Sequence, residues 1–197
     1  MIIKNLTQEQ VKTIYKNHMV NDFPASELKP LSMILKGMEK KIFECLGYVD
    51  EESGEILAYA VFVKNGNDYL FDYLAVISDS RNSGIGSSFL KQIAEHYKHA
   101  DSVIGEVEDP VFAKDDKEKN LQERRIGFYK RNGYIDTNVR VKLFGVDFKV
   151  FEMNLGRKHS EEEIKQLYKS HYKKILPIFL YWTSVKIKKY KKADITE

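Results

Sequence analysis

The sequence is poor in cysteine and has no long apolar stretch. Its single cysteine, Cys45, excludes an internal disulfide and any zinc site built from several cysteines. The longest apolar run, Ile175 to Trp182, is too short to span a bilayer. The start MIIKNLTQEQ turns polar at Lys4, unlike a signal peptide. We therefore expect a reducing, cytoplasmic setting.

The main body of the chain also lacks an excess of positive charge. The net charge is +3, but residues from 157 onward hold eleven Lys and Arg against five Asp and Glu. The first 156 residues hold 21 basic and 24 acidic side chains. A nucleic-acid-binding domain carries its basic surplus on the body itself, so we expect no nucleic-acid partner.

Apolar residues follow two different periods along the chain. Residues 43–77 form three strand-like runs joined by DEESGE and KNGND, whose Asp, Asn and Gly favour hairpin turns. Helical spacing follows Thr7, which can cap a helix, and again follows Gly84. The predicted order is strand, two helices, three strands, helix, strand, helix and two strands. This order predicts a mixed α/β fold with a mainly antiparallel central sheet flanked by helices.

The last forty residues differ from the rest in composition. The pattern SEEE at Ser160 begins a capping box, and an amphipathic helical face follows it. Residues 175–192 then resemble a basic amphipathic helix, which could pack on the main domain, join a second subunit as a homodimer, or lie on a membrane surface. We expect a main domain over 1–156 and a basic, helical extension over 157–197, with packing or a dimer contact favoured over the membrane.

A glycine-bearing turn, RNSGIGS, separates a strand from a helix. Unpaired backbone N–H groups and the helix dipole at such a helix start make an anion site. The turn is not a P-loop, because the G-K-[ST] ending is missing. A dinucleotide fingerprint fits poorly, because Phe89 stands where a third glycine is expected and the turn follows an antiparallel meander.

The same turn resembles motif A of the GNAT superfamily of N-acetyltransferases, written Q/R-x-x-G-x-G/A. Arg81, Gly84 and Gly86 match its three key positions. The later stretch FYKRNGY is similar to the second signature of the superfamily, and the resemblance covers roughly residues 2–155. It implies acetyl-CoA as co-substrate, bound through its pyrophosphate at the turn and through its pantetheine arm along the preceding strand. The residues implied in acetyl-CoA binding are Leu74, Ala75, Val76, Arg81, Asn82, Ser83, Gly84, Ile85, Gly86, Ser87 and Tyr129.

Two side chains are candidates for the proton transfers that acetyl transfer to an amine requires. The resemblance implies Tyr129 as the acid that protonates the departing thiolate, or as a ring that only packs under the cofactor. Glu106 in SVIGEVE is the candidate base that accepts the amine proton, directly or through a water. Glu106 and Glu108 share one face of their strand, so they point together or both lie at a solvated strand end.

The acceptor itself is not specified by the residues. An acidic cleft that includes Glu108 and Asp72, with Asp109 as a weaker candidate, would favour a cationic amine: a polyamine, an aminoglycoside-like molecule, a lysine side chain or a peptide N-terminus. The five histidines show no metal-ligand spacing, so we expect no metal. We predict an N-acetyltransferase that uses direct transfer. The alternative is a non-catalytic acyl-CoA-binding module whose basic tail contacts a membrane or a protein partner.

Overall fold

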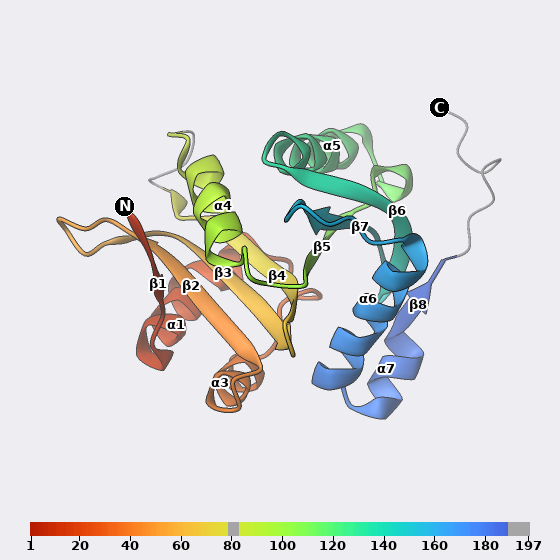
Figure 1. Cartoon of the computed structure of the whole chain (residues 1–197), viewed down its shortest axis with the longest axis horizontal. Helices are drawn as coiled ribbons and strands as arrows, with labels where there is room; N and C mark the ends of the chain where they lie inside the picture. Colours follow the sequence, from red (N-terminus) through yellow and green to blue (C-terminus); the bar gives the residue numbers. More distant parts are fainter. Residues whose placement is uncertain (79–82, 189–197) are drawn as a thin grey trace. The chain divides into compact units, whose positions relative to one another are not determined.

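The computed structural model describes residues 1–78 and 83–188, and the chain divides into two compact units, Met1–Val103 and Ile104–Glu197. Figure 1 shows the helices and strands of both units. Unit 1 holds strand β1 (Ile2–Asn5), helix α1 (Gln8–Ile14), the π-helical turn η1 (Tyr15–Met19), α2 (Val20–Asp22), α3 (Leu31–Glu39), β2 (Phe43–Val49), β3 (Ile56–Asn65), β4 (Asp68–Val76) and α4 (Ile85–His96).

The four strands of unit 1 form an antiparallel sheet in the order β1-β2-β3-β4. Both predicted hairpins are present. Gly54 and Gly66 take positive φ angles of 75° and 69° in the two turns, where glycine has no Cβ penalty. Strands β2 and β3 are almost continuously buried, with α3 and α4 packed against the sheet. This buried sheet fixes the position of β4, which ends at the glycine turn.

Unit 2 holds most of β5 (Ser102–Glu108), which begins at the end of unit 1. The 3-10 turn η3 (Pro110–Phe112), α5 (Asp116–Arg131), β6 (Tyr134–Leu143), β7 (Val146–Met153), α6 (Glu161–Ile175), α7 (Ile178–Ser184) and β8 (Val185–Ile187) follow. Its strands are ordered β5-β7-β6-β8, and all the neighbouring pairs are antiparallel. The predicted mixed α/β fold with a mainly antiparallel sheet is therefore confirmed.

Local capping chemistry sets several helix ends where the sequence predicts them. The Thr7 hydroxyl accepts a hydrogen bond from the Gln10 amide, and the Thr7 amide donates one to the Gln10 side-chain oxygen. Ser160 and Glu163 form the same reciprocal pair at the start of α6. Gly133, with a φ of 87°, follows the end of α5.

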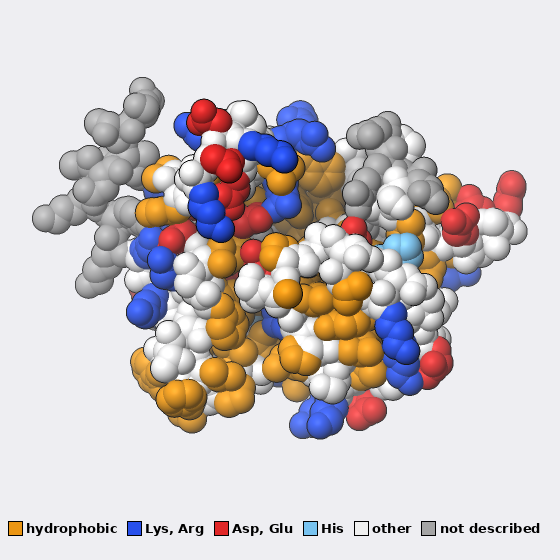
Figure 2. Space-filling view, turned by 180° about the vertical axis from the view of Figure 1, so that it is seen from behind, with side chains coloured by type: hydrophobic (Ala, Val, Ile, Leu, Met, Phe, Trp, Pro, Cys, Tyr) orange, Lys and Arg blue, Asp and Glu red, His pale blue; other side chains and the backbone are white. Residues whose placement is uncertain are grey.

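Over residues 175–188 the C-terminal segment differs from the single amphipathic helix expected for 175–192, whose last four residues lie outside the described part of the chain. α6 ends at Ile175, and Pro177 precedes the short helix α7. Residues 185–187 then form β8 against β6, because the β-branched Val185 and Ile187 suit a strand. Ile178, Phe179 and Trp182 of α7 are 68–77% exposed, and Figure 2 shows apolar side chains gathered there, at the lower left. A dimer or membrane contact of this segment stays a prediction, as does the division at residue 157.

Among the residues that the structure describes, no helix combines the length and the apolar character needed to cross a membrane.

Candidate active site

The end of β4 and the start of α4 carry the predicted acetyl-CoA contacts in unit 1. Leu74, Ala75 and Val76 are the last residues of β4, and all three are only partly buried. Gly84 is the N-cap of α4, with a φ of 79°, and no described side chain caps the helix start. Within the described residues no side chain therefore satisfies the first backbone N–H groups of α4, and the helix dipole favours an anion there. This arrangement fits a phosphate group.

Ser83, Ile85, Gly86 and Ser87 surround this helix start, each at least partly exposed. Ile85, Gly86 and Ser87 belong to the first turn of α4. The other two predicted contacts of the turn, Arg81 and Asn82, lie outside the described residues.

Asp72 lies at an irregularity in β4. The register with β3 pairs Val61 with Tyr73 and Phe62 with Phe71, which leaves Asp72 as an extra residue. Such bulges redirect a side chain. The Asp72 carboxylate contacts the Lys29 ammonium at 2.6 Å, and both side chains are largely buried, with 2% and 12% exposed. Asp72 is therefore the anion of a buried ion pair.

The ion pair fastens the loop before α3 to the sheet. The Tyr73 hydroxyl donates to the Glu27 carbonyl at 2.7 Å and accepts the Lys29 amide at 2.9 Å. The Tyr15 hydroxyl donates to the Lys29 carbonyl at 3.1 Å, and the Lys29 ammonium lies 5.2 Å from the centre of the Tyr73 ring. Asp72 acts on the shape of this loop through Lys29.

Glu106 lies on β5 and is held by α6. The Tyr168 hydroxyl donates to one carboxylate oxygen and the Tyr172 hydroxyl to the other, each at 2.6 Å. Both tyrosines are fully buried, whereas Glu106 is partly exposed. Hydrogen bonds donated to both oxygens favour the ionised form of a carboxyl group. The two donors are neutral, and they orient the carboxylate.

Glu108 and Tyr129 come together at α5. Glu108 pairs with Arg125, which precedes Tyr129 by one helical turn. Burial raises the pKa of Tyr129 to about 12; the nearby Arg125 opposes this shift and the Glu108 carboxylate adds to it. The phenol is therefore fully protonated near neutral pH. Its ring lies against Phe128 and Tyr134, with centroids 5.4 and 5.3 Å away.

Asp109 has a different environment at the end of β5. Its carboxylate contacts the Arg140 guanidinium at 2.6 Å, and both side chains are at least 90% buried. The same carboxyl group accepts the Val111 amide at the start of η3. Through these contacts Asp109 links the end of β5 to β6 and to the start of η3.

The structure thus distributes the predicted residues over two groups. Unit 1 carries Asp72, the end of β4 and the start of α4, while unit 2 carries Glu106, Glu108 and Tyr129. Sequence reasoning missed Lys29, Arg125 and the two tyrosines as partners of these carboxylates. The four-residue spacing of Tyr168 and Tyr172 places them on one helix face, but nothing local points that face at Glu106.

The surroundings of Cys45 and of the described acidic and histidine side chains bear on thiol and metal chemistry. Cys45 is buried, and burial raises the pKa of its thiol to about 12, so it stays protonated. Within residues 1–78 and 83–188, no group of three or more His, Cys, Asp or Glu side chains could hold a metal ion.

Comparisons with known proteins identify the domain that carries these residues. The profile of the family described as "Acetyltransferase (GNAT) domain" matches residues 44–136. Residues 44–136, slightly less than half of the chain, are thus similar to a GNAT acetyltransferase domain. The resemblance to the superfamily read from the sequence is confirmed over this range. No curated protein matches the chain in sequence.

Solved structures share the GNAT fold at low sequence identity. An acetyltransferase of the GNAT family from Bacteroides thetaiotaomicron superposes with a TM-score of 0.67 at 17% identity, covering 89% of this chain and 98% of that one. The ribosomal-protein-S18-alanine N-acetyltransferase from Escherichia coli gives 0.56 at 14% identity, covering 80% and 95%. An aminoglycoside 6'-N-acetyltransferase complexed with coenzyme A gives 0.58 at 14% identity, covering 81% and 100%.

Proposed function

We propose that this protein is an acetyl-CoA-dependent N-acetyltransferase that transfers the acetyl group directly to a primary amine. One observation in unit 2 carries the proposal. The residues similar to a GNAT domain present Glu106, whose two carboxyl oxygens each meet a tyrosine hydroxyl, and Tyr129, a protonated phenol; the reaction needs a base and an acid of these kinds. Acetyl-CoA supplies the activated acetyl thioester.

The start of α4 is the proposed binding element for the pyrophosphate of acetyl-CoA. The N–H groups after Gly84 supply neutral donors, and the end of β4 supplies backbone groups for the pantetheine arm. The coenzyme A complex of the aminoglycoside acetyltransferase supports this assignment at the level of the fold.

Glu106 is the proposed general base. An alkyl ammonium must lose a proton before its nitrogen can attack, and a fixed carboxylate accepts that proton directly or through a water. The partly exposed position of Glu106 on β5 leaves it accessible, while its two tyrosine donors hold the orientation. A base held in one geometry spends less time in unproductive rotamers.

Tyr129 is the proposed general acid. The departing thiolate of coenzyme A needs a proton, and a phenol whose pKa is raised to about 12 still carries one at any physiological pH. Direct transfer fits this pair of groups, because Cys45 is buried and protonated and cannot serve as a covalent nucleophile.

The proposed acceptor is a cationic amine. Glu106 contributes one carboxyl group, and Glu108 shares its strand face although Arg125 offsets the charge of Glu108. The similar structures include enzymes named for an aminoglycoside and for the alanine of ribosomal protein S18. Polyamines, aminoglycosides, lysine side chains and peptide N-termini are therefore the acceptor classes to screen.

The test is turnover with a panel of these amines, followed by the release of free thiol from acetyl-CoA. We expect Tyr129→Phe to lower kcat by roughly 10- to 1000-fold while calorimetry shows unchanged coenzyme A affinity. Tight coenzyme A binding without turnover on any amine would instead support the rival function, a non-catalytic acyl-CoA-binding module.

A further inference from the structure

Helix α6 reaches the proposed base from outside the recognised domain. The GNAT profile ends at residue 136, whereas Tyr168 and Tyr172 lie more than thirty residues further on. Their hydroxyls nevertheless occupy both oxygens of Glu106, over sequence separations of 62 and 66 residues. The C-terminal segment therefore contributes directly to the environment of the carboxylate.

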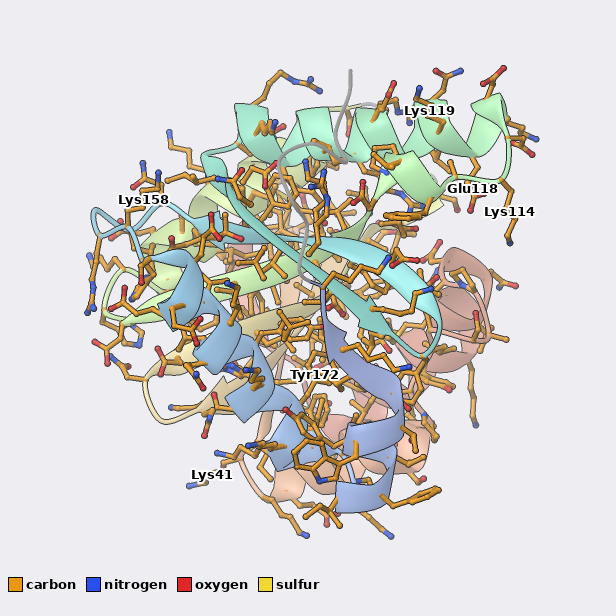
Figure 3. The ribbon with its side chains drawn as sticks, turned by 90° about the vertical axis from the view of Figure 1, so that its right-hand side faces the viewer. Lys41, Lys114, Glu118, Lys119, Lys158 and Tyr172 are labelled. Carbon is orange, nitrogen blue, oxygen red and sulfur yellow. The ribbon has the colours of Figure 1, made fainter. Side chains whose placement is uncertain are left out.

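The two tyrosines form a rigid clamp. They are four residues apart on α6, fully buried, and their ring centroids lie 4.7 Å apart. Tyr172 is labelled in Figure 3, where it comes from α6. Buried aromatic rings have few accessible rotamers, so each hydroxyl stays where its ring is packed. The carboxylate between them cannot rotate without losing a hydrogen bond.

The fold holds α6 itself in place at both ends. The capping box of Ser160 and Glu163 fixes its start, and Leu176 is buried just after its last residue. Along its length α6 packs against β6, α7 and β8. The positions of the two hydroxyls are thus determined by the whole helix and not by a flexible tail.

Other charged groups along and beside β5 have partners of their own in unit 2. Glu108 pairs with Arg125 of α5, and Asp109 pairs with Arg140 of β6. On the neighbouring β7, Lys149 pairs with Asp136 at 2.6 Å, and Glu152 pairs with His159. The two tyrosine hydroxyls are contacts through which α6 acts on Glu106.

We propose that Tyr168 and Tyr172 are positioning residues that orient the Glu106 carboxylate for proton abstraction, which makes α6 part of the catalytic apparatus. The proposal rests on the proposed function, in which Glu106 is the base. A merely structural clamp would satisfy a half-buried carboxylate and have no further effect on the reaction.

A double-mutant cycle separates the two roles. We expect Tyr168→Phe together with Tyr172→Phe to lower kcat/KM on the order of 10- to 100-fold, with unchanged affinity for coenzyme A. In a Glu106→Gln background the same two substitutions should cause no further loss, because their effect passes through the carboxylate. If the loss in kcat/KM of the triple variant equals the product of the losses from Glu106→Gln and from the two tyrosine substitutions, the positioning role is wrong.

The matched control is Tyr59→Phe in unit 1. Tyr59 is also buried, and its hydroxyl donates to the Asp22 carboxylate at 2.7 Å, but it lies on β3. We expect this variant to lose stability of a similar size and to keep kcat/KM within about twofold of the wild type. An equal kinetic loss in the control would show that the clamp variants report only on stability.

A second readout does not depend on the acceptor. In a carbon-13 NMR titration of the Glu106 carboxyl group, the midpoint should move up by about one pH unit when both tyrosine hydroxyls are removed, because donors to the ionised form are lost. An unchanged midpoint would refute the clamp. If Glu106→Gln retains full turnover while the midpoint moves, the clamp stands and Glu106 is not the base.

Discussion

Asp72 in unit 1 and Glu106 in unit 2 are both acidic residues on strands, but the fold gives them different partners. Asp72 meets the Lys29 ammonium at 2.6 Å, and its charge is matched inside the unit. Glu106 meets two neutral phenols, and these contacts orient its carboxylate. An ion pair anchors structure, whereas neutral donors leave a carboxylate that can still take up a proton or attract a cation.

The sharpest test of this comparison is the kinetic effect of neutralising each residue. We expect Glu106→Gln to lower kcat/KM by about 10²- to 10⁴-fold, because the proposed base is removed while the amide keeps the shape of the carboxylate. Asp72→Asn should stay within about threefold in enzyme that remains folded. Steady-state thiol release measures both, and equal kinetic losses would erase the distinction between the two sites.

For the free energy of unfolding we expect the opposite order, with a larger loss in Asp72→Asn than in Glu106→Gln. Asp72→Asn leaves the Lys29 ammonium largely buried without its counter-charge, so we expect a loss of about 2–3 kcal/mol in the free energy of unfolding. Denaturant titration measures this loss. The double variant Asp72→Asn with Lys29→Met should recover part of it, since no uncompensated charge remains. No recovery would mean that Lys29 contributes mainly through its other contacts to the loop.

Backbone geometry offers a third test within unit 1. Gly84 and Gly54 have positive φ angles of 79° and 75°, and a Cβ at either position meets nothing within 4 Å. Alanine at both positions should therefore cost a similar ~1 kcal/mol of stability. Only Gly84→Ala should weaken coenzyme A binding, by roughly tenfold, because only Gly84 precedes the proposed phosphate site. Calorimetry that shows equal affinity in the two variants would place the phosphate elsewhere.

The smallest expected effect concerns the buried phenol of unit 2. Burial raises the folded-state pKa of Tyr129 to about 12, above an unfolded value near 10. The folded state thus holds its proton longer, and the associated stability, complete below pH 10, is lost as the pH rises toward 12. Between pH 9 and pH 11 the wild type should lose about 1 kcal/mol more than Tyr129→Phe. Parallel loss in both proteins, measured by denaturant titration, would contradict this shift.

The fold could be predicted from the sequence because the patterns that indicate its helices, strands and turns are local. Hairpin glycines, the reciprocal caps at Thr7 and Ser160 and the alternation in β5 each act over a few residues. The C-terminal segment was less predictable, since Pro177 and the strand pairing of residues 185–187 replaced a continuous helix. Pairing of β8 with β6 depends on a strand more than forty residues earlier, which no local pattern contains.

By itself, the sequence determined the type and order of the elements, the glycine turn before α4, and the shared strand face of Glu106 and Glu108. Only the tertiary structure decided which donors each carboxylate meets. Lys29 reaches Asp72 across 43 residues, and Tyr172 reaches Glu106 across 66. Periodicity fixes the face on which a side chain lies, but its partner depends on how separate elements pack, and packing is a property of the whole fold.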